Sequence, residues 1–290
     1  MKFSFLPALL GSALAASNAS AQLMLPGALQ AAPEAASQAP KATAGPAKPR
    51  RIAPKPPGEE AIVDRDLLRD GAQGLIAFQR APGNGLEIKT LSMQGEQISH
   101  PGEVCRVDVV AGGPIEAKPS GKPAGLLRYD VDVEACPFSF DIFDGAVRVI
   151  REAKPCDFVA ADCRVDPTGI WGPAGTSIDD KQINQFERAR GSAETTMRSA
   201  FRALMARLGK DKAAVTKIAS EQAGFSSERE VACRNYAGED AHGFCALRLT
   251  QGRVLALEAV LEATAKENGD KRNAKPAKTT KVEATKEAKP

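Results

Sequence analysis

The sequence predicts an α+β protein, in which a small disulfide-linked antiparallel β-rich domain is followed by a three-helix antiparallel bundle. Three observations support this prediction. Residues 61–165 alternate apolar and polar side chains in short runs, a pattern typical of strands. From about residue 177 the apolar residues recur at three- and four-residue steps, as on amphipathic helices. The chain also carries six cysteines, an even number that favours disulfide bonds in an oxidising compartment.

Residues 1–21 have the layout of a secretory signal peptide. A basic residue precedes an apolar stretch, and Ala19-Ser20-Ala21 places small residues at the positions that a signal peptidase reads. We expect cleavage after Ala21 and a periplasmic or secreted location. The alternative is an uncleaved N-terminal anchor, which Pro7 and Gly11 within the apolar stretch disfavour. No later apolar run is long enough to cross a bilayer, so we expect no transmembrane segment.

The two ends of the mature chain are basic and low in complexity. Residues 22–60 are rich in Ala and Pro, and residues 265–290 repeat Lys with Ala, Thr, Pro and Glu, so both are expected to be disordered. The whole chain has a formal net charge of +3, whereas residues 58–264 sum to −6. The basic ends are predicted to contact anionic envelope polymers, and the acidic body suits a cationic partner. The alternative is that the ends only confer solubility.

The predicted β-rich domain spans residues 61–165. Its clearest strands are Leu127–Val133, Phe138–Phe143 and Ala146–Ile150, where apolar and polar side chains alternate. Asp144-Gly145 separates the last two of these runs. An Asp-Gly pair between alternating runs is a strong hairpin signal, because both central residues of a type I′ turn have positive φ.

The predicted helical domain spans residues 166–264. Ser177 is expected to cap the first helix, with Asp180 three residues later as in a capping box, and Gly209 is expected to end that helix. Asp211 is expected to cap the second helix. The third helix carries its apolar face from Phe244 onward. Short connections between the helices favour an antiparallel bundle, without a coiled coil.

The six cysteines are expected to form three structural disulfides. Cys233 ends the second predicted helix and Cys245 opens the third, so a Cys233–Cys245 bond would staple the connection between them. The other four cysteines allow three connectivities, of which Cys105–Cys136 with Cys156–Cys163 is the most local. A zinc site that includes Cys156 and Cys163 is the alternative, and the absence of any Cys-x-x-Cys pair disfavours it.

The sequence contains no recognisable catalytic motif, and it predicts no enzyme, no cofactor, no metal and no nucleic-acid partner. It has only two histidines. A metal site or a nucleophile-activating pair formed by His242 and Asp240 is the alternative to a solvated loop, and the loop explains these residues better. Trp171, the only tryptophan, is expected to anchor the sheet against the bundle; the alternative is an exposed contact residue.

The helical half resembles the helical domain of LprI-type lysozyme inhibitors. The resemblance covers about residues 160–260, and it rests on Gln222, Phe225, Arg229 and Arg253, together with Cys233, Cys245 and Leu257. Phe225 stands where that family usually has Trp, and Ser227-Glu228 stands where an aromatic residue commonly precedes the Arg. The matching positions are mostly architectural, so the resemblance implies the fold more than the activity.

The resemblance implies an exported binding protein of the cell envelope that inhibits a cationic lysozyme-like protein. We expect the contact at the acidic loop formed by Glu239 and Asp240, with His242 beside it, because acidic side chains would steer a cationic partner. The first alternative is an envelope structural or interaction module without inhibitory activity. The second is a peptidoglycan-directed enzyme in the β-rich half.

Overall fold

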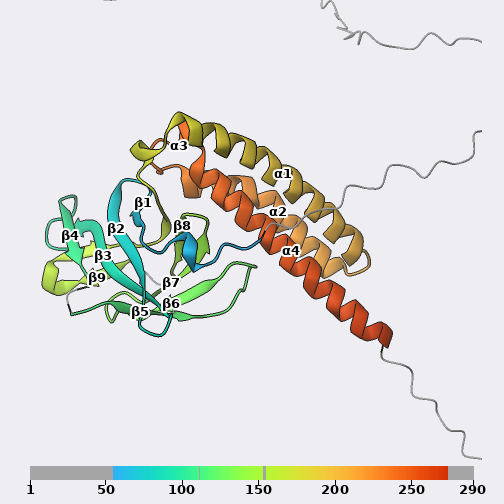
Figure 1. Ribbon diagram of the computed structural model, residues 1–290, viewed down its shortest axis with the longest axis horizontal. Helices are drawn as coiled ribbons and strands as arrows, with labels where there is room; N and C mark the ends of the chain where they lie inside the picture. The colour runs from blue at the N-terminus through green and yellow to red at the C-terminus, as the bar shows by residue number, and fades with distance from the viewer. Residues whose placement is uncertain (1–54, 111, 153–154, 274–290) are drawn as a thin grey trace, which may run out of the picture. The chain divides into compact units, whose positions relative to one another are not determined.

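A computed structural model describes residues 55–110, 112–152 and 155–273, with the side chains of 268–273 left aside. The predicted signal peptide, most of the predicted 22–60 linker and residues 274–290 of the predicted tail lie outside these residues. The described residues belong to one compact unit. Within the described residues, eleven strands precede four α-helices, and Figure 1 shows this order as a change from blue-green to yellow-red. The predicted fold class is wrong in two respects: the sheet is a closed barrel, and the helical part has four helices.

Eight strands close into an antiparallel barrel in the order β1-β2-β3-β5-β6-β7-β8-β11, with β11 paired back to β1. Their bounds are β1 Asp66–Arg69, β2 Gln73–Arg80, β3 Leu86–Gln97, β5 Ile115–Pro119, β6 Arg128–Val131, β7 Phe138–Phe143, β8 Ala146–Ile150 and β11 Gly169–Gly172. The closing strand β11 falls in the range predicted for the helical domain. Closure pairs the backbone groups that an open edge would leave without hydrogen bonds. The local alternation of apolar and polar residues does not reveal this closure.

The barrel interior is filled by side chains, as expected for eight strands. Phe78, Phe140 and Trp171 are among its largest fully buried members. The indole Nε1 of Trp171 donates to the carbonyl of Pro167 at 2.9 Å. Trp171 therefore belongs to the barrel core and is not an exposed contact residue.

The β7–β8 hairpin lies where Asp144-Gly145 predicts it. Phe143 faces Ala146, and the register continues to Asp141 opposite Arg148. Gly145 has φ 69°, whereas Asp144 is not among the described residues with positive φ. The turn is therefore not the type I′ turn expected from the sequence.

Three short strands extend the sheet beyond the barrel. The far half of β3 pairs with β4 (Val104–Asp108) and with β10 (Cys163–Val165), which in turn pairs with β9 (Cys156–Phe158). Gly95 of β3 lies opposite both Cys105 and Val165. A Cβ at Gly95 would meet the carbonyl oxygen of Arg164 at 1.9 Å, so glycine permits this close approach of β10.

The disulfides differ from the predicted local pairs Cys105–Cys136 and Cys156–Cys163. The structure joins Cys105 to Cys163 and Cys136 to Cys156 instead. In the β9–β10 pairing Cys156 faces Val165 and Cys163 faces Phe158, so the two cysteines are not cross-strand neighbours. Cys233 and Cys245 are joined, with their Cα atoms 5.6 Å apart. No described cysteine is free.

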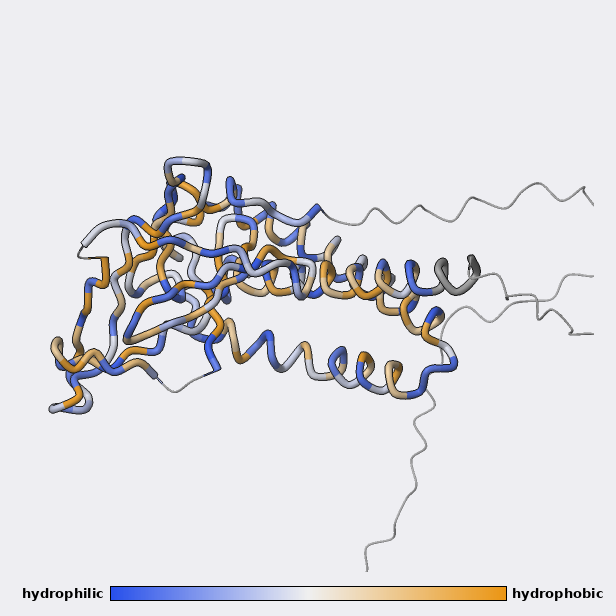
Figure 2. The backbone as a smooth tube through the Cα atoms, turned by 90° about the horizontal axis from the view of Figure 1, so that it is seen from below, coloured by the Kyte–Doolittle hydropathy of each residue, from blue (hydrophilic) through white to orange (hydrophobic). Residues whose placement is uncertain are grey.

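The three long helices are α1 Asp180–Leu208, α2 Lys212–Cys233 and α4 Phe244–Asn273. Asp179, not Ser177, caps α1: its side chain accepts from the Gln182 amide while the Gln182 side chain accepts from the Asp179 amide. Gly209 ends α1 and Asp211 caps α2. Helix α4 continues past the predicted domain end at residue 264. Figure 2 shows apolar and polar positions alternating along the turns of these helices.

The fourth helix, α3 (Glu239–His242), is a single turn within the connection that the Cys233–Cys245 bond closes. Gly238 and Gly243 bracket it with φ 74° and 60°. Two left-handed residues so close together isolate one helical turn. This is why the predicted three-helix bundle contains a fourth helix.

The outer wall of the barrel packs against α4. Phe143, Ala146 and Ile170 share a buried cluster with Phe244 and Leu249 of the helix. Gly252 marks the closest approach: a Cβ there would lie 2.6 Å from Cε1 of Phe143. A separate apolar cluster holds α1, α2 and α4 together farther along the bundle.

Among the described helices, none combines the length and apolar character that a membrane span requires.

Candidate functional site

The two acids of the predicted contact loop point in different directions. The Glu239 carboxylate accepts from the backbone amides of Cys245 at 2.9 Å and Ala246 at 2.8 Å, so it caps the start of α4. Its side chain is 14% exposed, and burial raises the pKa of this carboxyl above its usual value. Asp240 is exposed. Only Asp240 of this pair is thus available to a partner.

His242 is buried beneath the same loop rather than solvated. Its Nε2 lies 2.8 Å from the carbonyl oxygen of Ala237, and its Nδ1 lies 3.2 Å from the amide nitrogen of Phe244. A carbonyl accepts and an amide donates, so the ring carries its proton on Nε2 and accepts at Nδ1. The imidazole, only 3% exposed, thus connects the backbone at the two ends of α3.

The predicted loop lines a cavity of about 640 Å³ beside α2. Glu230, Glu239 and Asp240 line it together with Arg190, Arg229 and Arg234. Acids and arginines are equal in number there. The lining of this cavity is therefore not acidic overall.

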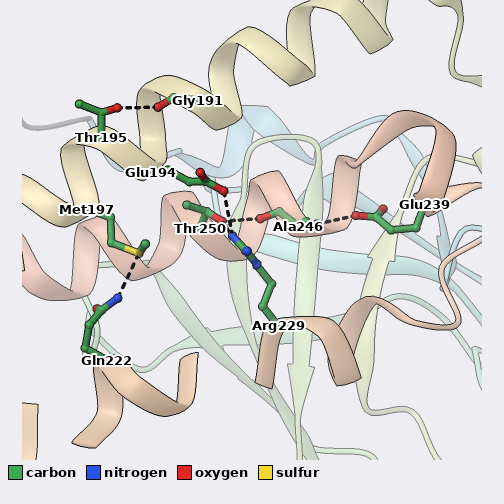
Figure 3. A network of polar contacts seen from close by, with 9 residues as sticks. All are labelled: Gly191, Glu194, Thr195, Met197, Gln222, Arg229, Glu239, Ala246 and Thr250. Carbon is green, nitrogen blue, oxygen red and sulfur yellow. Dashed lines mark hydrogen bonds and ion pairs between the residues drawn. The ribbon is translucent and has the colours of Figure 1, made fainter. Parts of the chain in front are cut away.

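The residues that carry the family resemblance meet in the interior of the bundle. Arg229 donates from Nη1 to Thr250 Oγ1 at 2.7 Å and to Glu194 Oε1 at 3.5 Å, and its guanidinium lies over the Phe225 ring. Figure 3 shows Arg229 reaching from α2 between Glu194 of α1 and Thr250 of α4. Arg229 thus links three helices through one side chain.

The same network continues to α3. Thr250 donates to the carbonyl of Ala246, whose amide donates to Glu239 (Figure 3). Gln222 contacts Met197 of α1 and accepts from Arg253 Nε at 3.2 Å. These polar contacts specify how the helices pack, and they support an architectural role for the motif residues.

A compact cavity lies where α2 and α4 meet the outer wall of the barrel. We call it the junction cleft. Its volume is about 280 Å³, close to the lower limit of about 300 Å³ for small-molecule sites. Barrel, loop and helix residues all contribute to its lining: Ala124, Leu126, Asp141, Phe143, Arg148, Glu221, Phe225, Glu228, Arg229, Ala232, Leu249, Gly252, Arg253 and Ala256.

Arg253 brings a buried guanidinium to the junction cleft. Its Nη1 donates to Glu221 Oε2 and its Nε to Gln222 Oε1, each at 3.2 Å. Its Nη2 is buried, and no acceptor for it occurs among the described residues. A buried donor without a partner costs about 1–3 kcal/mol. Nη2 is covered by the protein, so Arg253 contributes positive charge beside the cleft rather than a donor exposed in it.

Arg148 and Glu228 also line the cleft, and neither is bonded to Asp141, the acid that faces Arg148 in the hairpin. Asp141 accepts both of its bonds from Arg128, at 2.7 and 2.8 Å, and this bond is the main reason that the Arg128 pKa is raised. Arg148, opposite Asp141 in the hairpin, is exposed. Arg148 and Glu228 form no ion pair or side-chain hydrogen bond with each other or with any other residue that the structure describes.

Arg148 and Glu228 are site residues that the sequence analysis missed. Arg148 was detectable, because the Asp144-Gly145 hairpin signal fixes which residue faces Asp141. Glu228 lies on α2, where nothing in the helical period distinguishes it from its neighbours Ser227 and Glu230. Only the packing of α2 against the barrel wall brings Glu228 and Arg148 to one cavity.

Neither a search for metal ligands nor comparisons with known proteins add a function to this site. Within the described residues, no three or more His, Cys, Asp and Glu side chains gather as metal ligands. Searches of family models, curated proteins and solved structures returned no match to this chain.

Proposed function

We propose that this chain is an exported binding protein of the cell envelope that holds a ligand in the junction cleft. The observation that carries the proposal is that two charged side chains without a partner among the described residues, Arg148 and Glu228, line one cavity together with apolar residues. Small-molecule sites commonly combine apolar walls with a few polar groups that fix orientation. The cleft has this composition.

Export is the second part of the proposal. The sequence of residues 1–21 supports it, as do three disulfides among the described residues, since such bonds persist outside reducing compartments. A mature chain that begins at Gln22, by mass spectrometry of the envelope fraction, is the expected result. Recovery of the full-length chain from the cytoplasm with free thiols would contradict this part.

The cleft is tested by filling it. Ala256 is half-buried on α4 and lines the cavity, so Ala256→Phe should occupy the space that a ligand needs. Ala263→Phe, exposed on the same helix, is the matched control. The probe is a panel of small acids, amines, amino acids and sugars, read as shifts in melting temperature.

We expect at least one compound to raise the melting temperature of the wild type and of Ala263→Phe, but not of Ala256→Phe, because binding to the native state stabilises it. A panel in which no shift depends on Ala256 would refute the cleft as the binding site. The melting temperatures without ligand show whether each variant is folded.

Lysozyme inhibition is the second candidate function. The net charge of −6 over residues 58–264 favours it, because an acidic surface accelerates association with a cationic partner. Exposed Asp240 contributes to that charge. A turbidity assay of lysozyme on cell walls tests it: slower clearing with the purified protein supports inhibition, unchanged clearing refutes it, and faster clearing indicates an enzyme instead.

A further inference from the structure

We propose that the ligand of the junction cleft is an α-amino acid with an apolar side chain. This inference rests on the proposed function and names the ligand of the same site. Three features of the cleft lining carry it: a cationic side formed by arginines, an acidic side formed by a glutamate, and an apolar floor formed by aliphatic and aromatic side chains. Each corresponds to one group of such a ligand.

The cationic side is formed by Arg253 and Arg148. Arg253 lines the cleft and adds positive charge to it, while its Nη1 and Nε are bonded to Glu221 and Gln222 of α2. Arg148 has no bonded partner among the described residues, and its cross-strand neighbour Asp141 is bonded to Arg128 instead. A carboxylate is the acceptor that guanidinium groups bind most effectively.

The acidic side is formed by Glu228. Its carboxylate folds back along α2, where Gly224 leaves room: a Cβ at Gly224 would lie 3.2 Å from Glu228 Oε1. The Glu221 carboxylate is bonded to Arg253, whereas Glu228 has no bonded partner in the part of the chain that is described. An unpaired carboxylate in the same cavity as an unpaired arginine matches a ligand that carries both charges.

The floor is apolar and the volume is small. Leu126, Phe143 and Phe225 line the cavity from the loop, the barrel wall and α2. An aliphatic or aromatic side chain of the ligand would be buried against them, which favours binding. A cavity of about 280 Å³ suits one amino acid rather than a long peptide.

Calorimetric titration of the purified mature protein with L-phenylalanine tests the inference. Three analogues each lack one group: 3-phenylpropionate lacks the ammonium, phenethylamine lacks the carboxylate, and glycine lacks the apolar side chain. We expect L-phenylalanine to bind and each analogue to bind at least about ten-fold more weakly. 3-Phenylpropionate and phenethylamine each lose a bond to a charged group, and glycine loses the buried apolar side chain.

Two charge-removing variants locate the contacts. Arg148→Gln and Glu228→Gln change exposed, unpaired side chains, so both are expected to fold as the wild type does. Each should weaken L-phenylalanine binding at least about ten-fold. The matched controls are Arg106→Gln on β4 and Glu230→Gln on α2, which lie outside the cleft lining and should change the affinity less than two-fold.

Equal affinity for L-phenylalanine and 3-phenylpropionate, or unchanged binding in Glu228→Gln, would overturn the amino-acid assignment. If L-phenylalanine fails to bind while another compound of the panel shows a shift that Ala256→Phe abolishes, this inference fails and the proposed function stands. If no compound depends on the cleft, both fail.

Discussion

Removal of the Cys105–Cys163 bond should cost more stability than removal of the bond at α3. The first bond joins residues separated by 58 positions and the Cys233–Cys245 bond joins residues separated by 12. A cross-link restricts the unfolded chain more when it closes a longer loop. The free energy of unfolding should therefore fall by about 4 kcal/mol in Cys105→Ala/Cys163→Ala and by about 3 kcal/mol in Cys233→Ala/Cys245→Ala.

Equilibrium unfolding in urea measures both losses, and a thiol titration in denaturant checks the pairing. Each matched double variant should have no free thiol. The mismatched variant Cys105→Ala/Cys136→Ala should have two, on Cys156 and Cys163, because these face different partners across the β9–β10 pairing. Two free thiols in the matched Cys105 variant would refute the disulfide assignment. A loss below about 1 kcal/mol in that variant, with no free thiol, would refute the argument from loop length.

Three more predictions follow from the packing and electrostatics of the helical part. Gly252→Ala should lower the free energy of unfolding by about 1–3 kcal/mol, because the added Cβ overlaps the Phe143 ring; urea unfolding without a loss would contradict that contact. Gly191→Ala should raise the free energy of unfolding by up to about 1 kcal/mol, because a Cβ at this position of α1 meets nothing within 4 Å and alanine favours a helix interior. Burial raises the pKa of Glu239 in the folded state, so the folded state holds this proton more tightly than the unfolded state does. The stability of the wild type relative to Glu239→Gln should therefore fall as the pH rises above the pKa of this carboxyl in the unfolded state. Urea titrations from pH 4 to pH 7 check the sign, and a relative stability that rises with pH would contradict it.

The features that the sequence determined by itself are local ones. Asp211 caps α2, Gly209 ends α1, and the Asp144-Gly145 hairpin lies where the alternating runs predict it. Each of these depends on the φ preference or the hydrogen bonding of residues within a few positions of one another. The Cys233–Cys245 bond belongs with them, since it closes a short connection.

The tertiary structure alone decided the closure of the barrel, the remaining disulfides and the composition of the site. β1 pairs with β11 about a hundred residues away, and no periodicity within either strand encodes that pairing. The sequence predicts that Glu239 is an exposed acid, but its carboxylate accepts hydrogen bonds from the amides at the start of α4 and is turned inward. Likewise, Arg148 and Glu228 share a cavity only because α2 packs beside the barrel wall. Such juxtapositions follow from the packing of distant elements, which residue types and spacing do not specify.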